Sequence, residues 1–415
     1  MSKRNFILIV IILVVVVAVL FGFLYFYQPK SPGVVSETVN FLADFLPFGK
    51  SKTTTPTDTN QPVDVSGYIP NSDETQNIKL RKISTFPIAG YGVFMKEREV
   101  GVFAPALRYV NKATGNIYQT FADKIDERRF SSTVIPKVYE AFFGNEGNSV
   151  VMRYLKTDNK TIETFVGTVP KESLGVDLIA ANEVKGSFLP ENVSDISIAP
   201  DASKIFYLFN IADSAVGITL TLSTNTKVQV LDSPFTEWLS FWPNSKMITL
   251  TTKPSANVPG FMYAINPDRK DFNKILGGIN GLTTLASPDG KMVLYGDNNL
   301  SLSIFTMGTG SSSSLGVKTL PEKCVWGAVS DVIYCAVPKF IDRAQYPDSW
   351  YQGEVSFSDE IWKIDAVSGN TIMILDPVSV SGEEVDGIKL GLDENQNYLF
   401  FVNKKDSYLW ELNLK

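Results

Sequence analysis

The sequence predicts an all-β protein, a β-propeller of seven four-stranded blades preceded by one transmembrane helix and a disordered tether. Three observations lead to this prediction. One strand–turn–strand pattern recurs along residues 78–415, hardly any long helical periodicity competes with it there, and one long uncharged segment lies near the N-terminus.

The N-terminal segment has the length and composition of a membrane span. Residues 6–27 are 22 uncharged positions, and as a helix they would be roughly 33 Å long, close to the hydrocarbon thickness of a bilayer. Lys3 and Arg4 precede the segment, so residues 1–5 should stay cytoplasmic and the C-terminal domain should lie outside a single-pass cell membrane protein. A cleaved signal peptide is the alternative, but the length and the bulky end at Tyr25 and Tyr27 favour an uncleaved anchor.

Residues 28–77 form a stalk in this interpretation. Apolar residues recur at steps of three and four within 34–46, which predicts a short amphipathic helix on the membrane or on a partner. A few apolar residues that dip into the nearby membrane would give the same pattern. Residues 51–62 are Thr/Pro-rich without a large apolar side chain, so we expect a disordered linker there.

The repeats occupy residues 78–415. An apolar strand, a tight turn rich in Pro, Asp, Asn or Gly, and a second apolar strand recur at 196–209, 239–250 and 282–295. Weaker copies lie at 141–152, 325–334 and 390–401. The steps between the turns run from 40 to 66 residues, and a four-stranded propeller blade takes about 40–50 residues, so the longer steps require insertions.

The copy at 282–295, with Ser-Pro-Asp-Gly-Lys at 287–291, resembles the TolB-type propeller repeat and its WD-like relatives. The resemblance implies a fold and little about function. Six inner hairpins and an earlier blade near residues 91–121 indicate seven blades. Residues 109–118, 220–230 and 362–372 are predicted outer hairpins, and residues 78–83 are expected to supply the outer strand that the C-terminus lacks, which would close the ring.

Composition excludes several function classes. The chain contains no histidine, which removes the usual general base, the commonest metal ligand and all Ser-His-Asp chemistry. The formal net charge of −6 argues against nucleic acid as a partner. Phosphate-binding, dinucleotide-binding and nucleophile-elbow motifs do not occur. We therefore assign no catalytic residue, no metal and no cofactor from the sequence.

The best binding candidate is an aromatic-rich insertion at 340–357, because exposed loops on rigid scaffolds commonly bind ligands. Its candidate residues are Asp342, Arg343, Tyr346, Asp348, Trp350 and Tyr351. The alternative is a loop folded back over the propeller, with its aromatic residues as local packing. Separately, Cys324 and Cys335 fall opposite each other across a hairpin, and an oxidising exterior would favour a disulfide over two buried thiols.

These features favour a non-catalytic module held at the membrane by residues 6–27 that recognises a protein or a glycan. Two alternatives stay open. The chain could be a structural subunit of an envelope secretion or pilus assembly. It could also be a carboxylate-dependent enzyme, a lyase or other glycan-processing propeller, and carboxyl groups with raised pKa clustered in the central channel would favour that reading.

Overall fold

A computed structural model describes residues 78–122, 124–170 and 183–415 of the chain. The predicted cytoplasmic tip, membrane span (6–27), amphipathic helix (34–46) and linker all lie outside the described residues, so anchoring in a membrane stays a prediction. In the ranges just given, no helix is both long enough and apolar enough to span a bilayer.

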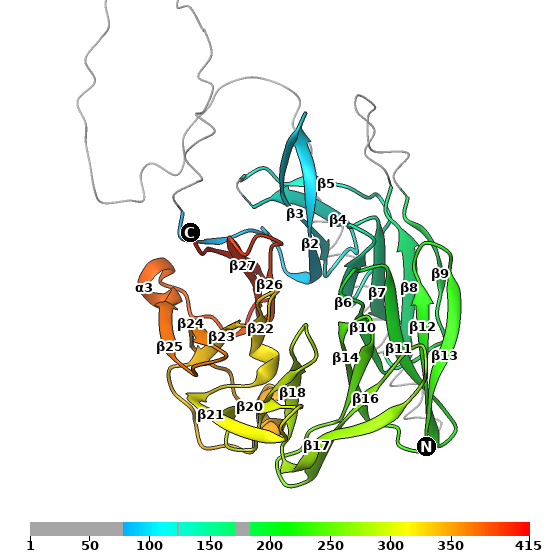
Figure 1. Cartoon of the computed structure of the whole chain (residues 1–415). Coiled ribbons are helices and arrows are strands. Elements are labelled where there is room, and N and C mark those ends of the chain that lie inside the picture. Colours follow the sequence, from blue (N-terminus) through cyan, green and yellow to red (C-terminus); the bar gives the residue numbers. More distant parts are fainter. Residues whose placement is uncertain (1–77, 123, 171–182) are drawn as a thin grey trace, which may run out of the picture. The chain divides into compact units, whose positions relative to one another are not determined.

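Seven antiparallel sheets of four strands each make up this part of the chain, which confirms the predicted propeller (Figure 1). Each strand pairs with its neighbour in the blade. In chain order the blades are blade 1, β2 (Ile88–Glu99), β3 (Val102–Asn111), β4 (Ile117–Phe121) and β5 (Arg128–Arg129); blade 2, β6 (Val138–Gly144), β7 (Ser149–Leu155), β8 (Ile162–Thr168) and β9 (Lys185–Phe188); blade 3, β10 (Asp195–Ile198), β11 (Lys204–Ile211), β12 (Ser214–Thr221) and β13 (Thr226–Ser233); and blade 4, β14 (Trp238–Asn244), β15 (Met247–Thr252), β16 (Pro259–Ile265) and β17 (Phe272–Asn280).

Blades 5 to 7 complete the ring. They are blade 5, β18 (Thr283–Ala286), β19 (Met292–Gly296), β20 (Ser301–Thr306) and β21 (Ser311–Lys318); blade 6, β22 (Cys324–Trp326), β23 (Val332–Pro338), β24 (Asp359–Asp365) and β25 (Thr371–Leu375); and blade 7, β26 (Gly387–Leu392), β27 (Tyr398–Asn403), β28 (Leu409–Asn413) and β1 (Leu80–Lys82). Three short helical turns lie among these described strands: η2 (Pro321–Lys323) before β22, α2 (Asp348–Tyr351) between β23 and β24, and α3 (Pro377–Ser381) between β25 and β26.

The hydrophobic core lies between the blades rather than inside any one of them. Each pair of consecutive blades, including blades 7 and 1, shares a cluster of buried apolar side chains. Phe206 of blade 3 packs with Trp238 and Leu250 of blade 4, for example. Because a blade buries its two faces only against its neighbours, the ring is stable as a whole and the blades are not independent units.

Local turn chemistry explains the inner hairpins that the sequence predicted. In the turn between β18 and β19, Gly290 has a φ of 69°, a left-handed conformation that glycine adopts without steric cost. Asp289 Oδ1 accepts hydrogen bonds from the Ser287 hydroxyl and the Lys291 amide, at 2.7 and 3.0 Å. These bonds fix the turn that reverses the chain between the two strands.

The ring is closed by one strand from each end of the described chain. The short strand β1 pairs with β28 as the outermost strand of blade 7, with Leu80 opposite Leu412 and Lys82 opposite Trp410. This confirms the prediction that residues 78–83 supply the strand missing at the C-terminus. The closure leaves blade 7 with the same four strands as every other blade.

Cys324 and Cys335 are directly opposite each other on β22 and β23, with Cα atoms 4.1 Å apart, and their sulfur atoms are bonded. The disulfide joins the inner two strands of blade 6, immediately after the turn η2. Both residues are buried in the cluster that blade 6 shares with blade 5. The bond therefore fixes the inner hairpin to which η2 is attached.

Removal of this disulfide should destabilise the domain. Closing a loop with a sequence separation of 11 contributes roughly 3 kcal/mol through the restricted unfolded chain. A Cys324→Ala/Cys335→Ala variant should lose about that free energy of unfolding in urea titrations, and reductant should affect the parent protein but not the variant. An unfolding midpoint shared by oxidised parent and variant would contradict this prediction.

Candidate functional site

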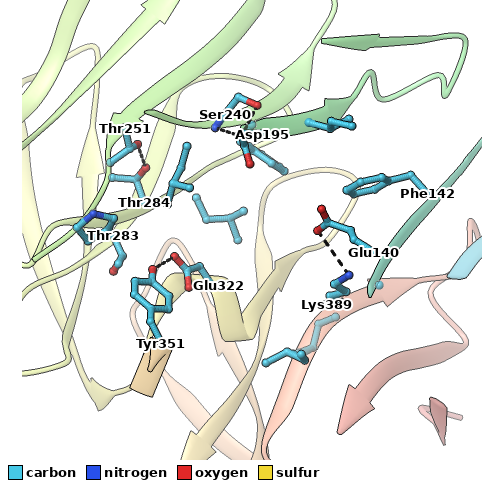
Figure 2. A pocket seen from close by; sticks show the side chains of 18 of the residues that line it. Glu140, Phe142, Asp195, Ser240, Thr251, Thr283, Thr284, Glu322, Tyr351 and Lys389 are labelled. Atoms are coloured by element: carbon cyan, nitrogen blue, oxygen red, sulfur yellow. Dashed lines mark hydrogen bonds and ion pairs between the residues drawn. The ribbon is translucent and has the colours of Figure 1, made fainter. Parts of the chain in front are cut away.

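The centre of the ring holds a cavity of about 840 Å³, a volume within the range of small-molecule sites. Its walls come from the inner strands β2, β6, β10, β14, β18 and β26, from η2 and from α2 (Figure 2). Most of the lining is apolar or aromatic, with a few hydroxyl groups. The charged residues of the lining are Glu140, Asp195, Lys253, Glu322 and Lys389.

Glu322 lies in η2, just before the inner strand of blade 6. Its Oε1 accepts a hydrogen bond from the Tyr351 hydroxyl, as Figure 2 shows. Among the described residues no partner reaches Oε2, and this atom is not buried. The protein around the carboxyl group of Glu322 removes it from bulk water and raises its pKa to about 7, and the negative charge of Asp195 adds to this effect. Glu322 is therefore a carboxylic acid that carries a proton near neutral pH and can release it into the channel.

Asp195 begins β10 in blade 3 and faces the same channel. Its Oδ2 accepts hydrogen bonds from the Ser240 amide at 2.5 Å and the Ser240 hydroxyl at 2.7 Å. No described residue bonds to Oδ1, which is also open to the channel. Burial raises the pKa of Asp195 to about 6, while the two donors of Ser240 favour its ionised form. At a pH near 7, Asp195 is therefore mostly ionised, whereas Glu322 is about half protonated.

A third charged group links blades 2 and 7. Glu140 accepts a hydrogen bond from Arg153 Nη1 at 2.5 Å, and its other oxygen lies 3.7 Å from Lys389 Nζ. Lys389 has a φ of 51° at an irregularity where β26 shifts register against β27. Such bulges redirect a side chain out of the regular alternation. Here the bulge aims the ammonium of Lys389 into the channel, and burial lowers its pKa.

The channel wall also offers apolar surface and hydroxyl groups to a ligand. Phe142 of β6, Phe241 of β14 and Tyr351 of α2 present aromatic surface to the cavity. Thr251 and Thr284 share a hydrogen bond of 2.6 Å between their hydroxyl groups at another part of the wall. Aromatic faces and fixed hydroxyls together are typical of pockets that orient a ligand by a few polar contacts within an apolar lining.

The insertion that the sequence singled out folds back over the propeller. Tyr346 and Trp350 are each only 4% exposed and pack with Phe357, whereas Tyr351 is 39% exposed and reaches the channel. The other three candidates do not line the channel. The Asp342 carbonyl oxygen accepts a hydrogen bond from the Tyr346 hydroxyl, and Asp348 Oδ2 accepts one from the Ala256 amide at 2.6 Å. Arg343 is exposed. Ligand binding by these residues stays a prediction.

Sequence reasoning missed the acidic residues of the channel. Glu140 and Asp195 lie on inner strands, and Glu322 lies in the turn before one, but nothing in their local sequence separates them from other acidic residues. The position of these residues in the repeat could have identified them. Residues at the start of an inner hairpin face the axis of a propeller, so acidic residues there are candidates for channel chemistry.

No model of a known protein family matches the chain, and no curated protein sequence matches it. Solved structures do match the fold. An oligogalacturonate lyase in complex with manganese aligns over 80% of this chain and 98% of its own, with a TM-score of 0.50 and 9% sequence identity. An oligogalacturonate lyase from Vibrio parahaemolyticus aligns over 81% of this chain and 99% of its own, with a TM-score of 0.49 and 8% identity. At this identity the first likeness supports the propeller fold.

The main functional interpretation from the sequence requires correction. A non-catalytic recognition module was favoured because no catalytic motif occurs in the chain. The first solved propeller just described is named a lyase, and this finding favours the enzyme alternative over the non-catalytic module. The absence of linear motifs misled the interpretation, because a propeller assembles its channel from separate strands and leaves no contiguous signature.

Manganese binding does not transfer to this chain with the fold. The chain has no histidine, and no group of three or more His, Cys, Asp or Glu side chains that could hold a metal occurs among the residues whose positions are described. Glu140, the acidic residue between blades 2 and 7, already pairs with Arg153 and Lys389. The donor set of the channel therefore does not fit a manganese site, and the chemistry below uses only side chains.

Proposed function

We propose that the central channel is the active site of an enzyme that cleaves glycosidic C–O bonds by general acid–base catalysis. Glu322 is the proton donor and Asp195 is the proton acceptor. The observation that carries the proposal is the pair itself: two carboxyl groups with raised pKa face one channel from blades 3 and 6, and each has one oxygen held by a hydroxyl donor and one oxygen open.

The proton balance of such a reaction is simple. The glycosidic oxygen takes the proton of Glu322 as its bond to carbon breaks, so the leaving group departs as a neutral alcohol. In a hydrolysis, Asp195 takes a proton from the water that attacks the same carbon. In an elimination, the acceptor takes a proton from the ring carbon beside a sugar carboxylate, and a carbon–carbon double bond forms. The solved lyase that shares the fold gives a reason to test elimination first.

The wall of the channel and the solved lyase that shares the fold both support a substrate class. Aromatic and hydroxyl groups line a cavity of about 840 Å³, which is large enough for a short oligosaccharide. Lys389, which lies 3.7 Å from Glu140, places an ammonium group in the wall of the same channel. Oligogalacturonate and other uronic-acid oligosaccharides are therefore the first substrates to test, followed by neutral oligosaccharides. The resemblance of residues 282–295 to the TolB-type repeat and the location outside the membrane remain predictions.

The test is a panel of defined oligosaccharides incubated with the full-length chain, with products separated by mass. An elimination product is lighter by one water than the hydrolytic product and absorbs in the ultraviolet because it carries an unsaturated uronate. Wild-type protein that cleaves none of the uronic-acid or neutral oligosaccharides, while remaining folded by circular dichroism, would contradict the proposed function.

The pH dependence of kcat should follow the two carboxyl groups. Activity should rise as the pH increases through about 6, where Asp195 loses its proton, and should fall above about 7, where Glu322 loses the proton that it must donate. The profile is therefore a narrow bell with its maximum near neutral pH. Activity that continues to rise from pH 7 to pH 9 would show that Glu322 is not the donor.

A further inference from the structure

The insertion between β23 and β24, residues 339–358, reaches from blade 6 to two other blades. On one side Asp348 Oδ2 accepts a hydrogen bond from the Ala256 amide of blade 4, at 2.6 Å. On the other side the indole of Trp350 donates to Asp386 Oδ2 at 3.0 Å, and Lys404 Nζ donates to the Trp350 carbonyl at 2.5 Å. Asp386 precedes β26, and Lys404 follows β27. The insertion is thus fastened across the ring at two places.

The anchor in blade 7 also holds the turn that carries Glu322. Lys323, the next residue in η2, pairs with Asp386 and with Asp359 Oδ2, the latter at 2.7 Å, and all three side chains are fully buried. Asp386 Oδ2 also accepts from the Phe357 amide at 3.1 Å, at the end of the insertion. One buried charge cluster therefore fixes both η2 and α2, the two elements that supply Glu322 and Tyr351.

We propose that the insertion is a clamp that positions the proton donor, with Tyr351 as the residue that orients Glu322. This inference rests on the function proposed above and adds the residue that determines how the donor is held. Three contacts carry it: the Tyr351 hydroxyl on Glu322 Oε1, the Trp350 indole on Asp386, and Lys323 on the same aspartate. Figure 2 shows the side chains of Tyr351 and Glu322 pointing toward each other.

The contact has a defined chemical consequence. The Tyr351 residue is 39% exposed, but desolvation around its hydroxyl and the negative charge of Glu322 raise its pKa, so the hydroxyl stays protonated and donates to Glu322 Oε1. While Oε1 is held in this way, the transferable proton belongs on Oε2, which is open to the channel. After the proton has left, the same hydrogen bond stabilises the carboxylate that remains. Tyr351 thus fixes which oxygen donates and where it points.

Tyr351→Phe tests the contact without a substrate. Full-length protein with ¹³C-labelled glutamate can be titrated by infrared spectroscopy, and subtraction of the Glu322→Gln spectrum isolates the Glu322 carboxyl signal. Loss of a hydrogen bond to a charged group should raise the Glu322 midpoint by about one pH unit. Asp195 and Lys323, the other charged groups that act on Glu322, are unchanged in the variant, so the difference reports Tyr351 alone.

Two further variants complete the experiment. Tyr346→Phe is the matched control, because its hydroxyl bonds within the insertion to the Asp342 carbonyl at 2.9 Å, and it should leave the midpoint unchanged. Trp350→Phe removes the indole donor from Asp386 and should raise the midpoint in the same direction as Tyr351→Phe. An unchanged midpoint in Tyr351→Phe, or a midpoint that moves equally in Tyr346→Phe, would overturn the inference.

The result separates the clamp from the proposed function. A midpoint that rises in Tyr351→Phe while the parent protein cleaves no glycan would support the clamp and refute the reaction. A midpoint that stays in place while the parent is active would refute the clamp and leave the reaction intact. With an active parent, Tyr351→Phe should also move the alkaline limb of the kcat profile upward by the same amount, with KM little changed.

Discussion

Replacement of Glu322 with glutamine is expected to lower kcat on the cleaved glycan by about 10²–10⁴-fold. Glutamine keeps the shape of the side chain and its Oε1 can still accept from Tyr351, so the turn η2 should keep its conformation. What is lost is the proton that the leaving oxygen requires. Without it the leaving group must depart as an alkoxide, and the barrier rises accordingly.

The steady-state kinetics of Glu322→Gln would be compared with those of Glu354→Gln. Glu354 is an exposed glutamate of the insertion at residues 339–358. The control should keep kcat and KM. In Glu322→Gln the residual activity should also lose its fall above pH 7, because the group responsible has been removed. Retention of more than about a tenth of the parent kcat, where acid catalysis commonly contributes 10²-fold or more, would assign the proton donor elsewhere.

Deletion of residues 78–83 should have the largest effect on stability. The deletion removes β1, so β28 loses its partner and blade 7 exposes an apolar edge around Leu412. It also removes Arg81, whose guanidinium forms a bidentate pair with the buried Glu411 at 2.9 and 3.0 Å and donates to the Ala122 carbonyl of blade 1 at 2.7 Å. Removal of one member of a buried ion pair is strongly destabilising by itself.

Thermal unfolding followed by circular dichroism tests this prediction. Deletion of residues 51–56, six positions of the predicted linker, is the control of equal length and should leave Tm unchanged. The Tm of Arg81→Ala should lie between those of the two deletions, since this variant keeps β1 but removes the bidentate pair between Arg81 and Glu411. If the chain without residues 78–83 melts at the same temperature as the control, blade 7 is stable without its fourth strand and the closure by β1 is structurally dispensable.

Much of the fold followed from local chemistry that a sequence displays directly. Turns such as that at Ser287 and Gly290 are set by their own residues, so their recurrence revealed the inner hairpins, and a count of strands revealed the gap that β1 fills. The outer hairpin predicted at 109–118 was wrong. It joins β3 and β4, the second and third strands of blade 1, and the outermost strand of that blade is the two-residue β5.

The channel was harder to predict because its geometry is non-local. Asp195 and Glu322 belong to blades 3 and 6 and share the channel only after the ring has closed. The direction of Lys389 depends on an irregularity in β26 that has no signature in the sequence. The sequence pattern identified the aromatic residues of the insertion. It could not show that Trp350 is buried, because the indole of Trp350 is held by Asp386, a residue of another blade.

The pairing of β1 with β28 that completes blade 7 also brings the two ends of the propeller together. The Asn413 amide donates to the Lys79 carbonyl at 2.9 Å, and Lys79 Nζ lies 3.3 Å from the Lys415 carbonyl oxygen. A short peptide could therefore join residue 415 to residue 79 and make all four strands of blade 7 consecutive in the chain. New ends could then be opened between β20 and β21, where Gly308 and Gly310 have free space around them. Such a circular permutant would move the joint between the two ends of the chain from blade 7 to blade 5, where β21 would come first in the chain and β20 last.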